Sequence, residues 1–170
     1  MTSGEAPAAW RGLYHPIAGR SCRISDKRAG LGGEWVDVDS PVGMSIDGDY
    51  DALYDMLDEQ EGALLFAELE ELLEQAERGL LHFEGRCGPE VDPHVKRMSL
   101  DPRVLELRLG PRQTAGLAQI LTRVYFTEPA GPDRVLLLLH VNAKNTANAT
   151  KSEQNNHIGN AGRRLDSHRW

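Results

Sequence analysis

The chain has few cysteines and no long apolar run, and each absence excludes a class of protein. Its 170 residues contain two cysteines, Cys22 and Cys87, which lie far apart and form no CxxC pair. This usage favours reduced thiols over a disulfide framework or a cysteine-based zinc site. No stretch holds the roughly 18 apolar residues of a membrane span, and residues 1–15 lack the apolar region of a secretory signal. The sequence therefore predicts a cytoplasmic protein without a membrane segment.

Charge is divided unevenly along the chain. Residues 1–90 carry 7 Lys and Arg against 19 Asp and Glu, a net charge of −12, whereas residues 91–170 carry 12 against 7, a net charge of +5. A basic half can meet phosphate, and an acidic half repels phosphate or covers the basic surface from within the same chain. The acidic half also fits ordinary helices with solvated glutamates. The length and the 40% hydrophobic content suit one compact domain.

The first third of the chain predicts an arm, a strand and two helices. Residues 1–33 mix Gly, Pro, Ser and Arg without periodicity, which indicates an irregular N-terminal arm. Residues 34–38 alternate as a short strand does. Asp49 is expected to cap a helix that begins at Tyr50, and a longer helix follows after Gly62. The core stripe of the longer helix is Leu65, Leu69, Leu72, Leu73, Ala76 and Leu80.

Three strand patterns and a last helix follow. Residues 104–109 alternate strictly, the second strand covers 123–126, and the third, Val135 to Asn142, has the unbroken apolar run of a strand covered on both faces. A Pro- and Gly-rich turn joins the second strand to the third. Thr150 and Glu153 then match a capping box at the start of a helix. That helix contains two glycines, each costing about 1 kcal/mol relative to Ala, and therefore needs docking to be stable.

If the three strands are antiparallel neighbours, Arg108, Arg123 and Tyr125 share one sheet face, and His140, Asn142 and Lys144 reach its rim. Such a cluster suits a phosphodiester, because arginines offer a planar fork of donors to phosphate oxygens. RNA cleavage without a metal needs a base for the 2′-hydroxyl, cations for the charged transition state and an acid for the leaving oxygen.

His140 and Lys144 are candidates for the proton transfers, and Arg108 and Arg123 are candidates for stabilising charge. Each residue also has an ordinary structural interpretation. Arg108 can simply pair with Glu106, and His140 can be a hydrogen-bonded residue at the edge of the core.

The order of these elements, together with Glu106-Leu107-Arg108, Arg123-Val124-Tyr125-Phe126, and Leu138-Leu139-His140 followed by Lys144, resembles the RelE/HigB-like toxin superfamily of bacterial type II toxin–antitoxin modules, including its phage-derived branch. The resemblance covers roughly residues 34–165. It implies a RelE-like α+β fold for residues 34–170, with a helical hairpin packed on a small twisted antiparallel sheet and a short C-terminal helix.

The resemblance also implies an activity and partners. These are metal-independent cleavage of mRNA without a cofactor, often on the ribosome, and inhibition by a cognate antitoxin, here expected to be of the helix-turn-helix type. The expected catalytic residues are Arg123, Lys144, Arg108 and His140. The expected RNA-binding residues are Lys96, Arg97, Tyr125, Asn142 and Lys151.

Two positions depart from the family pattern. Glu106 stands where these enzymes place a basic residue, and Asn145 stands where a second cation often follows Lys144. Both departures favour two alternatives to a ribonuclease. One is a ParE-like inhibitor that binds a protein such as gyrase without cleaving anything, and the other is a catalytically inactive, phage-derived interaction module of the same fold.

Overall fold

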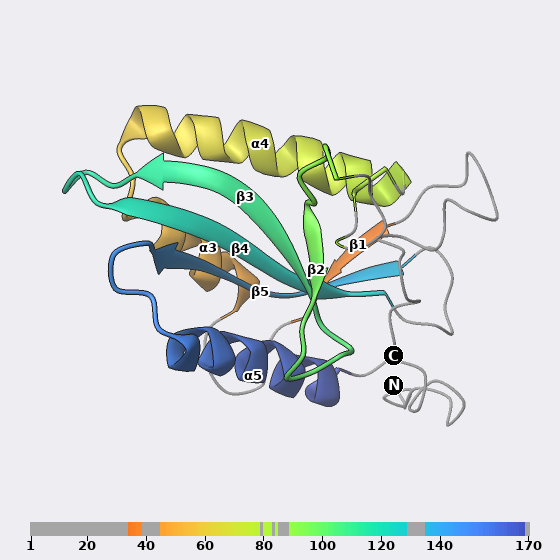
Figure 1. Cartoon of the computed structure of the whole chain (residues 1–170). Coiled ribbons are helices and arrows are strands. Elements are labelled where there is room, and N and C mark those ends of the chain that lie inside the picture. The colour runs from red at the N-terminus through yellow and green to blue at the C-terminus, as the bar shows by residue number, and fades with distance from the viewer. Residues whose placement is uncertain are drawn as a thin grey trace, which may run out of the picture.

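The computed structural model describes residues 34–38, 45–78, 80–82, 84, 89–128 and 135–168. The predicted arm and residues 129–133 of the predicted turn lie outside these ranges. Within them the fold is α+β, with three helices and one open, mixed sheet in the order β1-β5-β4-β3-β2 (Figure 1). The elements are β1 (Glu34–Asp37), α3 (Ile46–Tyr54), α4 (Glu59–Arg78), β2 (Val95–Arg97), β3 (Leu105–Gln113), β4 (Gln119–Thr127), β5 (Val135–Asn145) and α5 (Lys151–Ser167).

The sheet is mixed, so the predicted antiparallel sheet is wrong at one edge. β3, β4 and β5 are antiparallel neighbours, as expected, and the short strand β2, which was not predicted, pairs antiparallel with β3. β1 instead runs parallel to β5, from Glu34 opposite Val135 to Asp37 opposite Leu138. A parallel pair needs a long crossover connection, and here two helices and three strands lie between β1 and β5 in the chain. No local turn signal can therefore reveal this pairing.

Helix α3 begins earlier than predicted. Ser45, not Asp49, is its N-cap, and the Ser45 hydroxyl accepts a hydrogen bond from the Gly48 amide at 3.1 Å. The helix starts at Ile46, which is buried in the core. Asp49 consequently lies inside the helix, and its carboxylate is buried and bonded to other elements.

The helical hairpin covers one face of the sheet. Leu65, Leu69, Leu72 and Ala76 of α4 are buried against the strands, as the stripe predicts. Leu80 follows the end of the helix and is 58% exposed, so its predicted place in the core is wrong. This core includes Leu105, Leu107 and Leu109 of β3 together with Val124 and Phe126 of β4.

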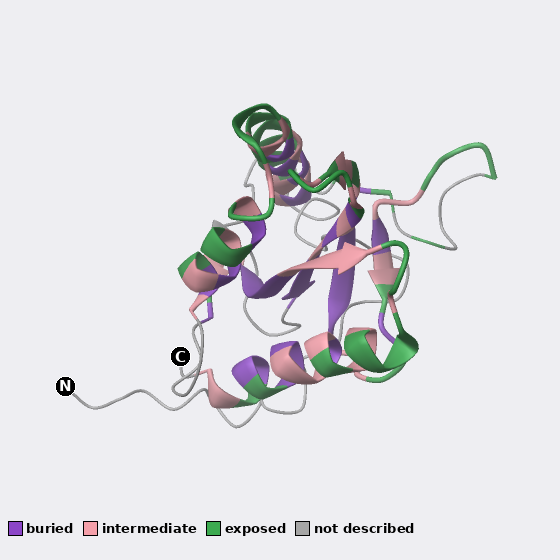
Figure 2. Ribbon diagram, turned by 90° about the vertical axis from the view of Figure 1, so that its left-hand side faces the viewer, coloured by how far each residue is buried: buried purple, intermediate pink, exposed green. Residues whose placement is uncertain are grey.

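Helix α5 covers the other face, so that α4 and α5 lie on opposite sides of the sheet (Figures 1 and 2). The predicted capping box is present, because the Thr150 hydroxyl accepts from the Glu153 amide and the Glu153 carboxylate accepts from the Thr150 amide. Ile158, Ala161 and Leu165 dock on the sheet, where they pack in one core cluster with the residues Val104, Tyr125, Leu137 and Leu139. Among the described residues, no helix combines the length and apolar character that crossing a membrane requires.

Candidate functional site

The register places the predicted cationic residues in rows across one face of the sheet. Arg108 lies opposite Arg123, and Arg123 lies opposite Asn142. The next row contains Glu106, Tyr125 and His140, and the row on the other side pairs Leu121 with Lys144. Because directly opposed residues of neighbouring strands share a face, the expected grouping is present on the side that α5 covers.

Glu106 holds the two arginines of this face. Its Oε1 atom lies 3.1 Å from Arg108 Nε and 3.5 Å from Arg123 Nε, and its Oε2 atom accepts a hydrogen bond from Gln154 of α5 at 2.9 Å. The carboxylate is 1% exposed. The two guanidinium groups and the Glu106 carboxylate alone carry a formal charge of +1, and the half-exposed Glu84 carboxylate lies 4.0 Å from Arg108 Nη1. Burial, opposed by the Glu106 charge, lowers the pKa of Arg123, which nevertheless remains cationic at neutral pH.

Tyr125 does not offer the exposed ring that a stacked RNA base requires. Its side chain is 1% exposed and belongs to the core beneath α5. The ring lies against His140, with centroids 6.0 Å apart. Burial, reinforced by the neighbouring Glu106 carboxylate, raises the pKa of the Tyr125 hydroxyl.

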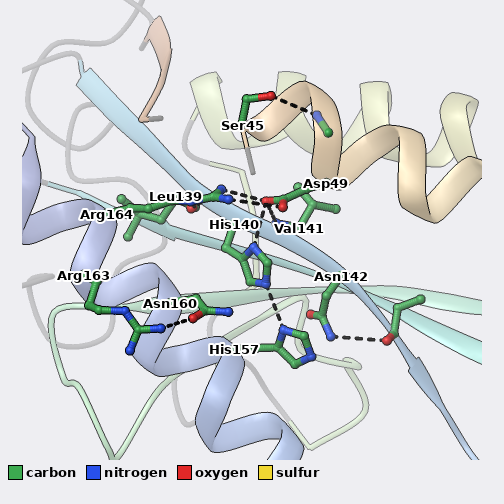
Figure 3. Close-up of polar contacts among 12 residues, drawn as sticks. Ser45, Asp49, Leu139, His140, Val141, Asn142, His157, Asn160, Arg163 and Arg164 are labelled. Carbon is green, nitrogen blue, oxygen red and sulfur yellow. Dashed lines mark hydrogen bonds and ion pairs between the residues drawn. The ribbon is translucent and has the colours of Figure 1, made fainter. Parts of the chain in front are cut away.

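A chain of three buried or half-buried groups crosses the molecule beside this cluster. Asp49 Oδ2 of α3 lies 2.7 Å from His140 Nδ1 of β5, and His140 Nε2 lies 2.8 Å from His157 Nδ1 of α5 (Figure 3). The two imidazole rings are stacked, with centroids 5.1 Å apart. Both ring nitrogens of His140 are therefore occupied, and the residue is only 7% exposed. His140 has no free nitrogen with which to contact a substrate.

The carboxylate at the inner end of this chain is firmly held. Arg164 of α5 reaches both oxygens of Asp49, and the Val141 amide donates to Oδ2 at 3.1 Å. Burial acts to raise the pKa of Asp49, but the hydrogen bonds from His140 and Arg164 outweigh it and hold the pKa below its usual value. Asp49 is therefore ionised at neutral pH, and its orientation toward His140 is fixed.

The outer end of the chain opens on a cleft of about 190 Å³. His157 lines this cleft together with Asn142 and Lys144 of β5, Glu153 of α5 and Met56. Burial, together with the neighbouring His140, lowers the pKa of His157, so its ring is neutral at neutral pH. Among the residues that the structure describes, neither His157 Nε2 nor the Lys144 ammonium has a hydrogen-bond or ion-pair partner.

The remaining predicted RNA-binding residues lie away from the cleft. Lys96 is on β2, three strands from β5, and pairs with Glu84 at 3.6 Å. Arg97 alternates to the opposite face, where its Nε atom donates to the Pro102 carbonyl. Lys151 is exposed in the first turn of α5.

Sequence reasoning missed the residues at both ends of the buried chain, Asp49 and His157, as well as Arg164. A helical signal exists for two of them, because His157 and Arg164 are seven positions apart and therefore lie on one face of α5, beside its apolar stripe. No such signal exists for Asp49, since 91 positions separate it from His140.

The described residues contain no cluster of three or more His, Cys, Asp or Glu side chains placed to hold a metal ion. In comparisons with known proteins, no family model, no curated protein and no solved structure matches this chain.

Proposed function

We propose that the chain is a RelE/HigB-like toxin that cleaves mRNA as a metal-independent endoribonuclease in the cytoplasm. One observation carries the proposal: Arg108, Arg123 and Asn142 form a row on the same sheet face as the cleft that contains Lys144 and His157. Cations and an imidazole are thus close together on rigid strands and a docked helix. This is the set of groups that phosphodiester cleavage without a metal requires.

The order of the elements supports the family assignment. A helical hairpin, four antiparallel strands and a capped helix follow one another along the chain, which is the order that the resemblance implies apart from the short strand β2. Conversely, the parallel strand β1 was not part of that expectation. As a member of this family the chain would have a cognate antitoxin and would meet its mRNA free or on the ribosome.

The charges of the site are compatible with a phosphate but are partly neutralised. Glu106 compensates one of the two arginines, Glu84 lies 4.0 Å from Arg108 Nη1, and Lys144 adds one positive charge at the cleft. Phosphate contacts of this kind make binding depend steeply on salt.

The Glu106 carboxylate also favours a second function. Because Glu106 already holds Arg108 and Arg123, this face can bind a partner without cleaving RNA, as a ParE-like inhibitor or an inactive interaction module would. The two functions differ in one measurable product, new RNA ends.

The test is induced expression of the full chain followed by mapping of transcript ends. Growth arrest with new ends is expected for the unaltered chain, and Lys144→Ala should lower cleavage because it removes an unpaired ammonium from the cleft. Arg78→Ala is the control, since it removes one positive charge from an exposed position on α4, which packs on the opposite face. Growth arrest without new ends would reject the ribonuclease and favour the binding function.

A further inference from the structure

We infer that His157 is the catalytic base of this site, that Asp49 and His140 are the buried residues that position it, and that the cleft receives a ribose 2′-hydroxyl beside a phosphodiester. The inference rests on the proposed ribonuclease function. It reassigns the proton transfer first expected of His140, which has no nitrogen available to a substrate.

One tautomer of the hydrogen-bond chain makes Nε2 the basic nitrogen of His157, and the inference uses that tautomer. The Asp49 carboxylate is only an acceptor, so His140 Nδ1 must carry a proton toward it. In the tautomer with a proton on Nδ1 alone, His140 Nε2 is an acceptor, and His157 Nδ1 carries the proton between the two rings. The lone pair of His157 is thereby placed on Nε2, the ring nitrogen without a partner among the described residues.

The arrangement prepares His157 to accept a proton. When Nε2 is protonated, His157 Nδ1 keeps its hydrogen bond to His140, so the ring accepts the proton without turning. Arg164 and the Val141 amide keep the Asp49 carboxylate in place. The helix and the strand that carry the two histidines are packed together, so the ring orientation is set before a substrate arrives.

The cleft supplies the other groups of a transesterification. His157 Nε2 removes the proton of the 2′-hydroxyl, the 2′-oxygen bonds to the adjacent phosphorus, and the bond from phosphorus to the 5′-oxygen breaks. The Lys144 ammonium, which lines the same cleft, donates a proton to the departing 5′-oxygen. The products are a 2′,3′-cyclic phosphate and a 5′-hydroxyl end, and water then returns the proton from His157 to Lys144.

Several titratable groups surround His157. They are His140 and Lys144 from β5, Asp49 from α3, Glu153 from α5 and Tyr125 from β4. His140 opposes a positive charge on His157, whereas Glu153 and Asp49 favour it. Cleavage should therefore decline on the acid side as His157 becomes protonated.

The test measures 5′-hydroxyl ends produced by the full chain in a cell-free translation extract, which supplies both mRNA and ribosomes. His157→Ala should lower the rate by about a hundredfold or more, the usual scale for losing a positioned base. Added imidazole should restore part of this loss. The control is His82→Ala, because His82 is an exposed histidine outside the cleft. Its cleavage rate should equal that of the unaltered chain.

The outcomes separate the two proposals. No cleavage by the unaltered chain removes the ribonuclease function, and this inference with it. Cleavage that persists in His157→Ala at the original rate removes this inference alone. For the positioning role, His140→Gln should shift the acid limb of the pH–rate profile to higher pH, because His140 no longer opposes protonation of His157. A lower rate with an unmoved acid limb would reduce His140 to a structural residue.

Discussion

Asp49 of α3 and Arg164 of α5 form a buried ion pair, with Oδ2 and Nη1 2.7 Å apart, although 115 positions separate them in the chain. The pair lies where β1 ends and β5 continues. There Asp49 accepts the Val141 amide, and Arg164 donates to the Leu139 carbonyl at 2.9 Å. The described pairing between β1 and β5 ends at Leu138. Beyond that point, side chains of α3 and α5 form hydrogen bonds with backbone groups of β5 in place of a strand.

Substituting Arg164 should therefore destabilise the fold strongly. Arg164→Met leaves the Asp49 carboxylate buried without its guanidinium partner, and breaking a buried pair typically costs about 3 to 5 kcal/mol. The matched control is Arg163→Met, because Arg163 is exposed and bonds only to Asn160 of its own helix among the contacts of the described residues. The control should change stability by only about 0.5 kcal/mol. Urea denaturation checks both values, and equal unfolding midpoints for the two variants would contradict the prediction.

The two glycines of α5 should respond oppositely to alanine. A Cβ atom at Gly162 would lie 2.8 Å from Asp101 Oδ2, and that carboxylate is held by Arg103 at 2.7 Å. Gly162→Ala should therefore destabilise the protein despite its better helix propensity. At Gly159 the nearest atom is Arg163 Nη1 at 3.8 Å, so Gly159→Ala should gain up to about 1 kcal/mol. Thermal unfolding distinguishes the two variants. A higher melting temperature in both would show that residues 101–103 move aside to accommodate the added methyl group.

Acid should weaken the fold partly through His157. Its pKa in the folded protein is lower than the ordinary value of 6.5, so the stability linked to its neutral form is complete above pH 6.5 and is lost as the pH falls through the folded pKa. Burial lowers the pKa of His94 and His168 as well, so the acid sensitivity of the unaltered chain does not report on His157 alone. A variant of His157 isolates its contribution. Between pH values of about 7 and about 5, His157→Gln should lose less melting temperature than the unaltered chain. Equal losses of melting temperature in the two proteins would mean that His157 has the same pKa in the folded and unfolded states.

Much of the fold follows from local sequence patterns. The alternation of residues 104–109, the stripe on α4 and the capping box at Thr150 each depend on neighbours in the chain, and each prediction is confirmed apart from Leu80 of the stripe. The sequence analysis also considered β3, β4 and β5 as antiparallel neighbours, an arrangement that puts Arg108 and Arg123 on a shared face, and the structure has it. The predictions were wrong where a contact between residues far apart in the chain determines the local structure. Asp49 suits a helix cap by its type, but Ser45 caps the helix while Asp49 bonds to Arg164.

Only the site residues that lie on strands could be predicted from the sequence. Residues such as Arg123, Asn142 and Lys144 follow from periodicity once the strands are aligned. The contribution of His157 depends instead on how α5 docks, because a helix seen in sequence alone does not specify which strand its polar residues meet. The crossover that makes β1 parallel to β5 is likewise a tertiary feature without a local signal.

Glu106 should limit the affinity of this face for nucleic acid. Its carboxylate neutralises one of two adjacent arginines, and Glu106→Gln removes that charge while retaining an oxygen acceptor for Arg108 and Arg123. The row then rises from a formal charge of +1 to +2, so the variant should bind single-stranded RNA more tightly at low salt. If one further phosphate is neutralised, the slope of log affinity against log salt should steepen by about 0.7, the value for one contact on a single strand. Titrations of a labelled RNA oligonucleotide over a range of salt concentrations measure this slope, with a melting curve to confirm that Glu106→Gln is folded. An unchanged slope would mean that phosphates do not reach Arg108 and Arg123, and the row would then belong to a protein-binding surface.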